Sequence, residues 1–318
     1  MFKNFQYARN PGGDRWVLSR RVFLKSSAFA AAGLLFRPAW SFADLFDNSV
    51  KVRFGIVTDS HYADIDTHGT RHYRESIDKM TECITFMNDK KVDFVMHLGD
   101  FKNGAPSGNI ENLRLIESIY GQFNGPRYHV LGNHDMDSIS KDQFQSVVDN
   151  TGIKPEHTYY SFDRGGVHFV VLDANFRNDG VPYDNGNFSW TDANVPADQL
   201  DWLEADLAAT SYPSVICIHQ LLDRDEGNHY VRNAVEVRRT LERHPHVLTV
   251  FQGHQHAGQY NLINDIHYYT QKAMVEGSGK ENNSYAIVEV FDDLTLVISG
   301  YRKAISQELS RKQETGAH

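Results

Sequence analysis

The feature that most constrains the fold is a series of short apolar segments, each of which ends in a polar residue. The first three segments are residues 51–58, 93–98 and 127–130, and residues 71–88 and 109–122 between them have helical spacing. This alternation predicts an α/β fold with parallel crossovers. Ligands bind beyond the carboxyl ends of the strands in such sheets, so the polar residues there are predicted to form one site.

The residues that follow these predicted strands are of the types that bind metal ions. Asp59-Ser60-His61 follows the first strand, and residues i and i+2 of an extended chain point to the same side, so Asp59 and His61 can hold one cation. Residues 215–218 and 247–251 form two later apolar segments that lead into histidines. The candidate ligands are Asp59, His61, Asp100, Asn133, His219, His254 and His256.

Two carboxylates, four imidazoles and one amide are too many ligands for one ion of ordinary coordination. They suit two ions that share a bridging carboxylate. Asp100 is the predicted bridge, because the preceding Gly99 permits close approach. Oxygen and imidazole ligands without thiolate suit manganese, iron or zinc, and the sequence does not decide among the three metals.

In their order and spacing these motifs resemble the calcineurin-like metallophosphoesterase family, over roughly residues 51–300. The matching elements are Asp-x-His at 59–61, Gly-Asp at 99–100, Gly-Asn-His-Asp at 132–135, His219, and Gly-His-x-His at 253–256. The resemblance implies a four-layer α/β/β/α sandwich with mixed sheets. It also implies a dinuclear centre in which a hydroxide that bridges the two metals attacks phosphorus.

The resemblance further implies which residues serve each ion and the reaction. One ion takes Asp59, His61, Asp100 and His256. The other takes Asp100, Asn133, His219 and His254. His134 is predicted to be the catalytic histidine, with Asp135 orienting its imidazole. From their positions in predicted strands, His97 and His129 are the other histidines expected to support the ligands, and Asp173 either braces the site or only caps a turn.

Residues 71–76 are similar to the manganese-dependent ADP-ribose/CDP-alcohol diphosphatase branch of the family. That branch has Gln in the place of His61 and Glu in the place of Asp135, so its substrate range is not carried over to this chain. Arg71, Arg74 and Asn133 are predicted to bind substrate phosphate, although arginines of this kind more often form surface salt bridges.

The predicted function is hydrolysis of phosphoester or diphosphate bonds in small molecules, such as phosphodiesters or nucleoside diphosphate conjugates. A broad phosphomonoesterase that scavenges phosphate is the main alternative. A non-catalytic metal-binding scaffold is a weaker alternative, because a scaffold would be expected to have lost ligands.

Residues 1–43 predict an export signal. Ser19-Arg20-Arg21-Val22-Phe23-Leu24-Lys25 precedes an apolar run, and this order resembles the twin-arginine consensus; an ordinary secretory signal is the alternative. The expectation is cleavage after Ala43, passage through the twin-arginine export machinery and a periplasmic or secreted bacterial protein without stable membrane insertion. Residues 44–50 are then a linker, 51–302 the phosphoesterase domain and 303–318 a charged tail.

Charge and cysteine content bound the partners. The chain has 32 basic and 41 acidic residues, and residues 1–43 carry seven basic and one acidic, so the remainder has a net charge of −15. No broad basic surface for long nucleic acids is expected, whereas a small phosphorylated substrate is compatible with bound metal. Cys83 and Cys217 can form a disulfide only if the fold brings their Cα atoms within reach, which the sequence does not decide.

Overall fold

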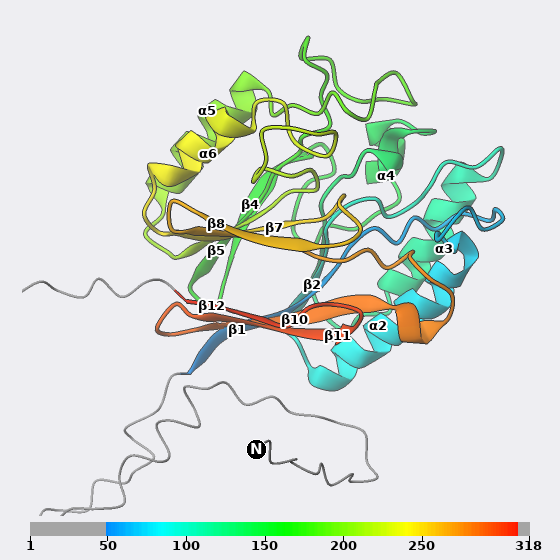
Figure 1. Ribbon diagram of the computed structural model, residues 1–318, viewed down its shortest axis with the longest axis horizontal. Coiled ribbons are helices and arrows are strands. Elements are labelled where there is room, and N and C mark those ends of the chain that lie inside the picture. The colour runs from blue at the N-terminus through cyan, green and yellow to red at the C-terminus, as the bar shows by residue number, and fades with distance from the viewer. Residues whose placement is uncertain (1–48, 311–318) are drawn as a thin grey trace, which may run out of the picture. The chain divides into compact units, whose positions relative to one another are not determined.

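The structure of this chain is a computed structural model that describes residues 49–310. Two six-stranded sheets pack face to face, and helices cover the outer face of each sheet (Figure 1). Both sheets contain parallel and antiparallel pairs. The predicted four-layer α/β/β/α sandwich with mixed sheets is therefore confirmed.

The first sheet brings three parallel carboxyl ends to one edge. Its strands, in spatial order, are β12 (Gln307–Leu309), β11 (Leu296–Arg302), β10 (Ser284–Phe291), β1 (Val50–Val57), β2 (Phe94–His97) and β3 (Arg127–His129). Strand β1 pairs in parallel with β2, and β2 pairs in parallel with β3, whereas β10 to β12 are antiparallel. The turns after β1, β2 and β3 therefore lie side by side.

The second sheet has a parallel centre. Its strands, in spatial order, are β4 (Tyr160–Arg164), β5 (Val167–Val171), β6 (Ser214–Cys217), β7 (Val247–Gln252), β9 (Ile266–Thr270) and β8 (Gln259–Ile263). Strands β5, β6, β7 and β9 run parallel, so the turns after β6 and β7 are neighbours. A hairpin joins β4 to β5 through Gly165 and Gly166, which both have positive φ.

Helices complete the outer layers. The first sheet is covered by α2 (Ser76–Lys90) and α3 (Asn109–Tyr120), and the second by α5 (Ala197–Ala209) and α6 (Ala234–Glu242) (Figure 1). The other described helices are short: η2 (Tyr73–Glu75), η3 (His134–Met136), α4 (Lys141–Gln145) and η4 (Lys280–Asn282). None of the described helices has an apolar stretch long enough to cross a bilayer.

Strand β1 shows how the layers fit together. Phe54 points between the sheets, where its ring stacks on Phe94 at 4.9 Å and meets the edge of Phe169 at 5.2 Å. Burial of each such ring stabilises the fold by roughly 1.5–3 kcal/mol. Gly55 faces α2 instead, and a Cβ there would lie 2.6 Å from the Met87 sulfur, so this glycine allows the helix to approach.

The structure extends the predicted domain and corrects several element boundaries. The domain was expected to end at residue 302, but β12 adds a further strand and its Leu309 is completely buried. Three residues with one buried side chain are too short to give a periodic signal. The helix predicted over residues 71–88 begins as an α-helix at Ser76, after the 3-10 turn η2.

Other sequence predictions are settled or lie outside the described part. Cys83 and Cys217 are both free and buried, and burial raises the pKa of both thiols. Residues 1–43, the predicted export signal, and 311–318 of the predicted tail lie outside the described residues. Residues 175–195 contain no helix or named strand.

We expect the stability of the fold to depend on pH through His168 of β5. Its Nδ1 lies 2.7 Å from Asp163 and its Nε2 lies 2.9 Å from Asp206 of α5. Burial alone would lower the pKa of His168, but the hydrogen bonds with Asp206 and Asp163 outweigh it and raise the pKa. Stabilisation by these contacts is complete below the unfolded pKa and is lost as the pH rises through the folded pKa.

The measurement is urea unfolding of wild-type protein and Asp206→Asn between about pH 5 and pH 9. Asp206→Asn is expected to lower the unfolding free energy by about 1–3 kcal/mol at the acidic end. The difference between the proteins should shrink as the pH rises. A difference that stays constant or grows with pH would contradict a protonated His168.

Candidate metal centre

Six of the seven predicted metal ligands meet where the carboxyl ends of both sheets adjoin, and the seventh, Asn133, directly precedes His134, whose backbone nitrogen donates to Asp100 Oδ1 at 2.8 Å. Asp59, Asp100 and Asn133 follow β1, β2 and β3 of the first sheet, whereas His219 follows β6 and His254 follows β7 of the second. All five of these side chains are buried. Burial of so many ionisable groups is unfavourable unless they are paired or bind a metal, so their convergence indicates a binding site.

The backbone at these positions is strained. Asp59, His61, Asp100 and His254 have φ angles of 51°, 44°, 54° and 65°. Each left-handed residue of this kind costs on the order of 1–3 kcal/mol and persists only where its surroundings fix it. Hydrogen bonds from Asp59 N to Gly99 O at 3.0 Å and from His61 N to Asp100 O at 2.9 Å fix two of these turns.

Two glycines allow the turns to pack against each other. A Cβ on Gly132 would lie 2.2 Å from both the backbone nitrogen and Oδ1 of Asp100. A Cβ on Gly99, whose φ is +97°, would lie 2.4 Å from Nδ1 of His219. Any side chain at either position would displace a candidate ligand, which is the physical reason for the glycines noted in the sequence motifs.

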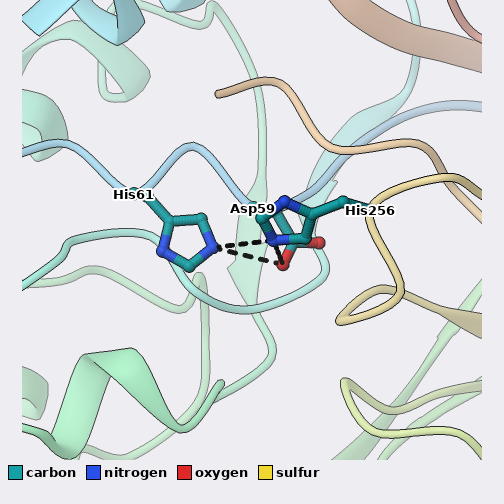
Figure 2. A group of neighbouring side chains, drawn as sticks. All are labelled: Asp59, His61 and His256. Carbon is teal, nitrogen blue, oxygen red and sulfur yellow. Dashed lines mark hydrogen bonds and ion pairs between the residues drawn. The ribbon is translucent and has the colours of Figure 1, made fainter. Parts of the chain in front are cut away.

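One group of ligand atoms gathers around the carboxylate of Asp59 (Figure 2). Asp59 Oδ1 lies 3.3 Å from Nε2 of His256 and 3.4 Å from Nε2 of His61. The two Nε2 atoms face each other at 3.2 Å. Nitrogen and oxygen atoms at these separations can bind one ion together, because metal–ligand bonds of about 2.0–2.2 Å place neighbouring ligands roughly this far apart.

A second group forms around Asp100 with His219 and His254, and its donor atoms lie within 4.8 Å of one another. Asp100 Oδ2 is 3.1 Å from Nε2 of His219 and 3.4 Å from Nε2 of His61. Asp100 therefore lies between the two groups, as the predicted bridging ligand must.

The imidazoles are held with Nε2 directed into the centre. His219 Nδ1 donates to Leu98 O at 2.7 Å, and His256 Nδ1 lies 2.5 Å from the carboxylate of Glu276. A proton fixed on Nδ1 leaves the lone pair of Nε2 available for a metal and also orients the ring. Glu276 was not predicted, because it follows a different strand and belongs to none of the motifs.

The unsatisfied atoms of the site test whether metal ions fit. Within residues 49–310, four candidate ligand atoms are buried without a hydrogen-bond partner: Asp59 Oδ1, Asn133 Oδ1, His219 Nε2 and His254 Nε2. Buried polar atoms without a partner cost free energy, and metal coordination would satisfy all four. The residues present therefore fit two ions, one held by the Asp59 group and one by the Asp100 group.

The ionisation of the site follows from its buried charges. Burial opposes the charge on Asp59, but the close imidazoles of His256 and His61 keep the pKa of its carboxyl well below the usual value. Burial lowers the pKa of His219, but the charge of Asp100 outweighs this and raises it to about 9. A metal ion must displace the proton held by His219, so metal binding is coupled to proton release.

The structure corrects the predicted partner of His134. Asp135 does not contact the imidazole, because its buried carboxylate accepts hydrogen bonds from four backbone N–H groups, those of Asp100, Phe101, Lys102 and Gly132. Asp135 therefore connects the turn after β2 with the turn after β3. The imidazole Nδ1 of His134 lies 3.2 Å from Asp137 instead, three residues further along the turn η3.

Asp137 is itself anchored by a buried lysine. Lys102 Nζ donates to Asp137 Oδ1 at 2.6 Å and to the carbonyl oxygen of His134 at 2.8 Å. The ring of His134 lies 4.6 Å from that of His61, so it borders the candidate ligands. An i, i+3 spacing from His134 to Asp137 was visible in the sequence, but its meaning depends on the turn that brings the two side chains together.

The predicted phosphate-binding arginines are engaged with acidic groups. Arg74 is exposed and contacts Asp64 at 2.5 Å and Asp66 at 2.7 Å, so it is a surface salt bridge in this structure. Arg71 Nε lies 3.9 Å from Glu276, which in turn contacts His256. Arg71 is therefore near the centre, and Arg74 is not placed to bind phosphate.

Of the remaining predicted residues, His97 and Asp173 contact the turns, whereas His129 lies 3.1 Å from Glu117 of α3. His97 Nδ1 accepts from Gly99 N at 3.2 Å. Asp173 accepts from the side chain of Asn175, which also donates to Leu131 O at 2.8 Å, directly before Gly132. A cavity of about 580 Å³ opens beside His256 and Glu276, and Lys272 and Lys303 contribute to its walls.

The fold and the ligand cluster define a metal-dependent hydrolase of the α/β/β/α sandwich class. The sequence matches the calcineurin-like phosphoesterase family over residues 52–258. The chain belongs to this family. It is therefore a phosphoester hydrolase with a dinuclear metal site.

Similar proteins agree with this assignment. The chain is 24% identical over 296 residues to a manganese-dependent ADP-ribose/CDP-alcohol diphosphatase of Oryza sativa subsp. japonica, which covers 79% of this chain and 92% of the relative. An Arabidopsis thaliana protein of the same name is 23% identical over 290 residues, covering 77% and 93%. A dimetal phosphatase structure from Danio rerio shares the fold, with a TM-score of 0.71, 19% identity and coverage of 83% and 100%.

We expect His254→Ala to reduce the bound metal from two ions to about one per chain, because the Asp100 group loses one ligand while the Asp59 group stays intact. Asp100→Asn is expected to lose more metal, because Asp100 lies between both groups. Elemental analysis of purified protein measures the stoichiometry. The exposed histidine variant His157→Ala is the control, and two ions retained by His254→Ala would contradict the assignment.

We expect His134→Ala to retain metal but to lose about 10²–10⁴-fold in turnover of substrates with poor leaving groups. Asp137→Asn should cause a smaller loss, because the imidazole remains but is less well oriented. Asp142→Ala, a change to an exposed carboxylate of α4, is the control.

A double-mutant cycle separates this role of Asp137 from a general effect. If Asp137 acts through the imidazole, Asp137→Asn should have little further effect on turnover in the His134→Ala background. Full additivity of the two losses would show that Asp137 does not act through His134.

Proposed function

We propose that this chain hydrolyses the diphosphate bond of small nucleoside diphosphate conjugates. The observation that carries the proposal is the buried cluster of metal ligands with four unsatisfied atoms at the meeting point of the two sheets. Two relatives that align with over three quarters of the chain are named ADP-ribose/CDP-alcohol diphosphatases, which supports this class of substrate.

The chemistry divides between the metals and the protein. When bound, the two ions supply positive charge for phosphate oxygens and lower the pKa of water at the site. Asp59, Asp100 and the histidines hold the ions, and their burial keeps bulk water from screening that charge. His134 borders the ligands and, with its Nδ1 held by Asp137, can present Nε2 as a proton donor to the leaving oxygen.

The cavity beside His256 supplies room for a substrate larger than phosphate. Its volume of about 580 Å³ is in the range of small-molecule sites. Lys272 and Lys303 line this cavity together with Glu276 and a candidate ligand, His256, so its walls offer charged groups of both signs. A substrate with a second phosphate or a polar arm is therefore favoured over a simple monoester.

A substrate panel tests this proposal. Purified protein loaded with manganese is assayed with ADP-ribose, CDP-glycerol, a bis-aryl phosphate and an aryl phosphate monoester. The expected result is the highest kcat/KM on one of the two conjugates, with nucleoside monophosphate as a product. A preference for the monoester would support a phosphomonoesterase instead, and no turnover of any substrate by metal-loaded protein would support a binding scaffold.

We propose in addition that the protein is exported in folded form through the twin-arginine route. Ser19-Arg20-Arg21 and the apolar residues that follow support this, as does the start of the family match at residue 52, well beyond the segment. The active protein would then be periplasmic or secreted.

Export is tested by expressing the full chain and an Arg20→Lys/Arg21→Lys variant in a bacterium with a twin-arginine system. We expect wild-type protein in the periplasmic fraction with an N-terminus at Asp44, and the variant retained in the cytoplasm. An intact Met1 on the periplasmic wild-type protein, or export of the variant equal to that of the wild type, would contradict this route.

A further inference from the structure

An exposed tryptophan lies beside the candidate metal ligands. Trp190 is 41% exposed, and the centre of its ring system is 5.6 Å from the ring of His254. His229 lies 5.4 Å from Trp190 and 5.1 Å from His254, so three rings are in mutual contact. Single exposed aromatic residues are ordinary on protein surfaces. This one differs because it touches a residue of the metal centre.

The loop that carries Trp190 is held in place by contacts on both sides. Tyr183, which is fully buried, stacks on Phe188 with a ring separation of 3.8 Å and donates to Ser189 O at 3.1 Å. Arg232 Nε donates to Thr191 O at 2.6 Å. The residues before and after Trp190 are thus fixed, and the ring is presented without the entropy cost of ordering a free loop.

The charged groups around this aromatic surface are already engaged. Among the described residues, Arg224 binds the side chain of Gln259, and Arg232 binds Thr191 O and the hydroxyl of Tyr230. Arg71, whose charge acts on His229, lies 3.9 Å from Glu276. The surface therefore offers stacking area rather than a free cation, and it suits an uncharged planar group better than a phosphate.

We propose that Trp190 and His229 form the subsite for the base of a nucleotide substrate. The inference rests on the proposed function and assigns the nucleoside arm to the His254 side of the centre. The cavity on the His256 side of the centre, which Lys272 and Lys303 line, is then left for the non-nucleoside arm of the substrate. Stacking depends on the face of the ring, which every base has, so the subsite accepts adenine and cytosine with little discrimination.

The first test uses tryptophan fluorescence of the manganese-loaded protein titrated with AMP or CMP, the products that retain a base. Both nucleotides are expected to quench the fluorescence of the wild-type protein and of the control variant Trp202→Phe. Trp202 lies on α5 and contacts Tyr159, away from the metal ligands. The quench should be lost in Trp190→Phe. A quench that persists in Trp190→Phe would overturn the subsite.

The second test separates stacking from apolar contact by calorimetry. Trp190→Leu is expected to weaken binding of AMP and CMP by about 10- to 100-fold, while Trp190→Phe binds them nearly as well as wild-type protein. Ribose 5-phosphate, which lacks a base, should bind all three proteins equally. Equal binding of AMP by Trp190→Leu and wild-type protein would refute the subsite.

Kinetics distinguish failure of the subsite from failure of the proposed function. If wild-type protein hydrolyses ADP-ribose and Trp190→Leu has an unchanged KM, the subsite is wrong and the proposed function stands. If wild-type protein hydrolyses neither conjugate, the proposed function is wrong, and the nucleotide binding measurements still decide whether Trp190 contacts a base. A KM raised by about 10- to 100-fold in Trp190→Leu supports both.

Discussion

The structure depends on the burial of two carboxylates, Asp59 and Asp100, at the ends of neighbouring parallel strands. Both are almost completely inaccessible, and a buried negative charge is tolerated only with compensating positive charge. His219 and His256 contribute to this compensation: burial lowers their pKa values, but Asp100 and Asp59 outweigh it and raise both to about 9. The left-handed turns, the required glycines and the orientation of the imidazoles all serve to place these groups around two ions.

The sequence predicted the parts of the site that strand ends and motifs define. Asp59, Asp100, Asn133, His219 and His254 were found because each follows an apolar segment of strand length, and the structure brings them together. Their roles as ligands remain predictions. The fold class could be predicted for the same reason, because alternating strands and helices leave few ways to cover a sheet.

The sequence failed where a contact depends on a local turn or on a segment without periodicity. Asp135 stands next to His134 in sequence, but a tight turn sends its carboxylate to backbone N–H groups and brings Asp137 to the imidazole. Glu276 and Trp190 lie in irregular segments, so no pattern distinguished them. Arg74 was proposed with the similarity of residues 71–76 to the diphosphatase branch, and the structure shows the surface salt bridges with Asp64 and Asp66 that were the stated alternative.

The two groups of ligands both draw on both sheets. The Asp59 group includes His256 from the second sheet, and the Asp100 group includes His219 and His254. Bound metal ions would therefore link the two sheets along this edge, next to the hydrogen bond from His219 Nδ1 to Leu98 O, which already connects them. Metal occupancy and the stability of the contact between the two sheets are then thermodynamically linked. Removal of metal by a chelator weakens this contact, and each bound ion strengthens it.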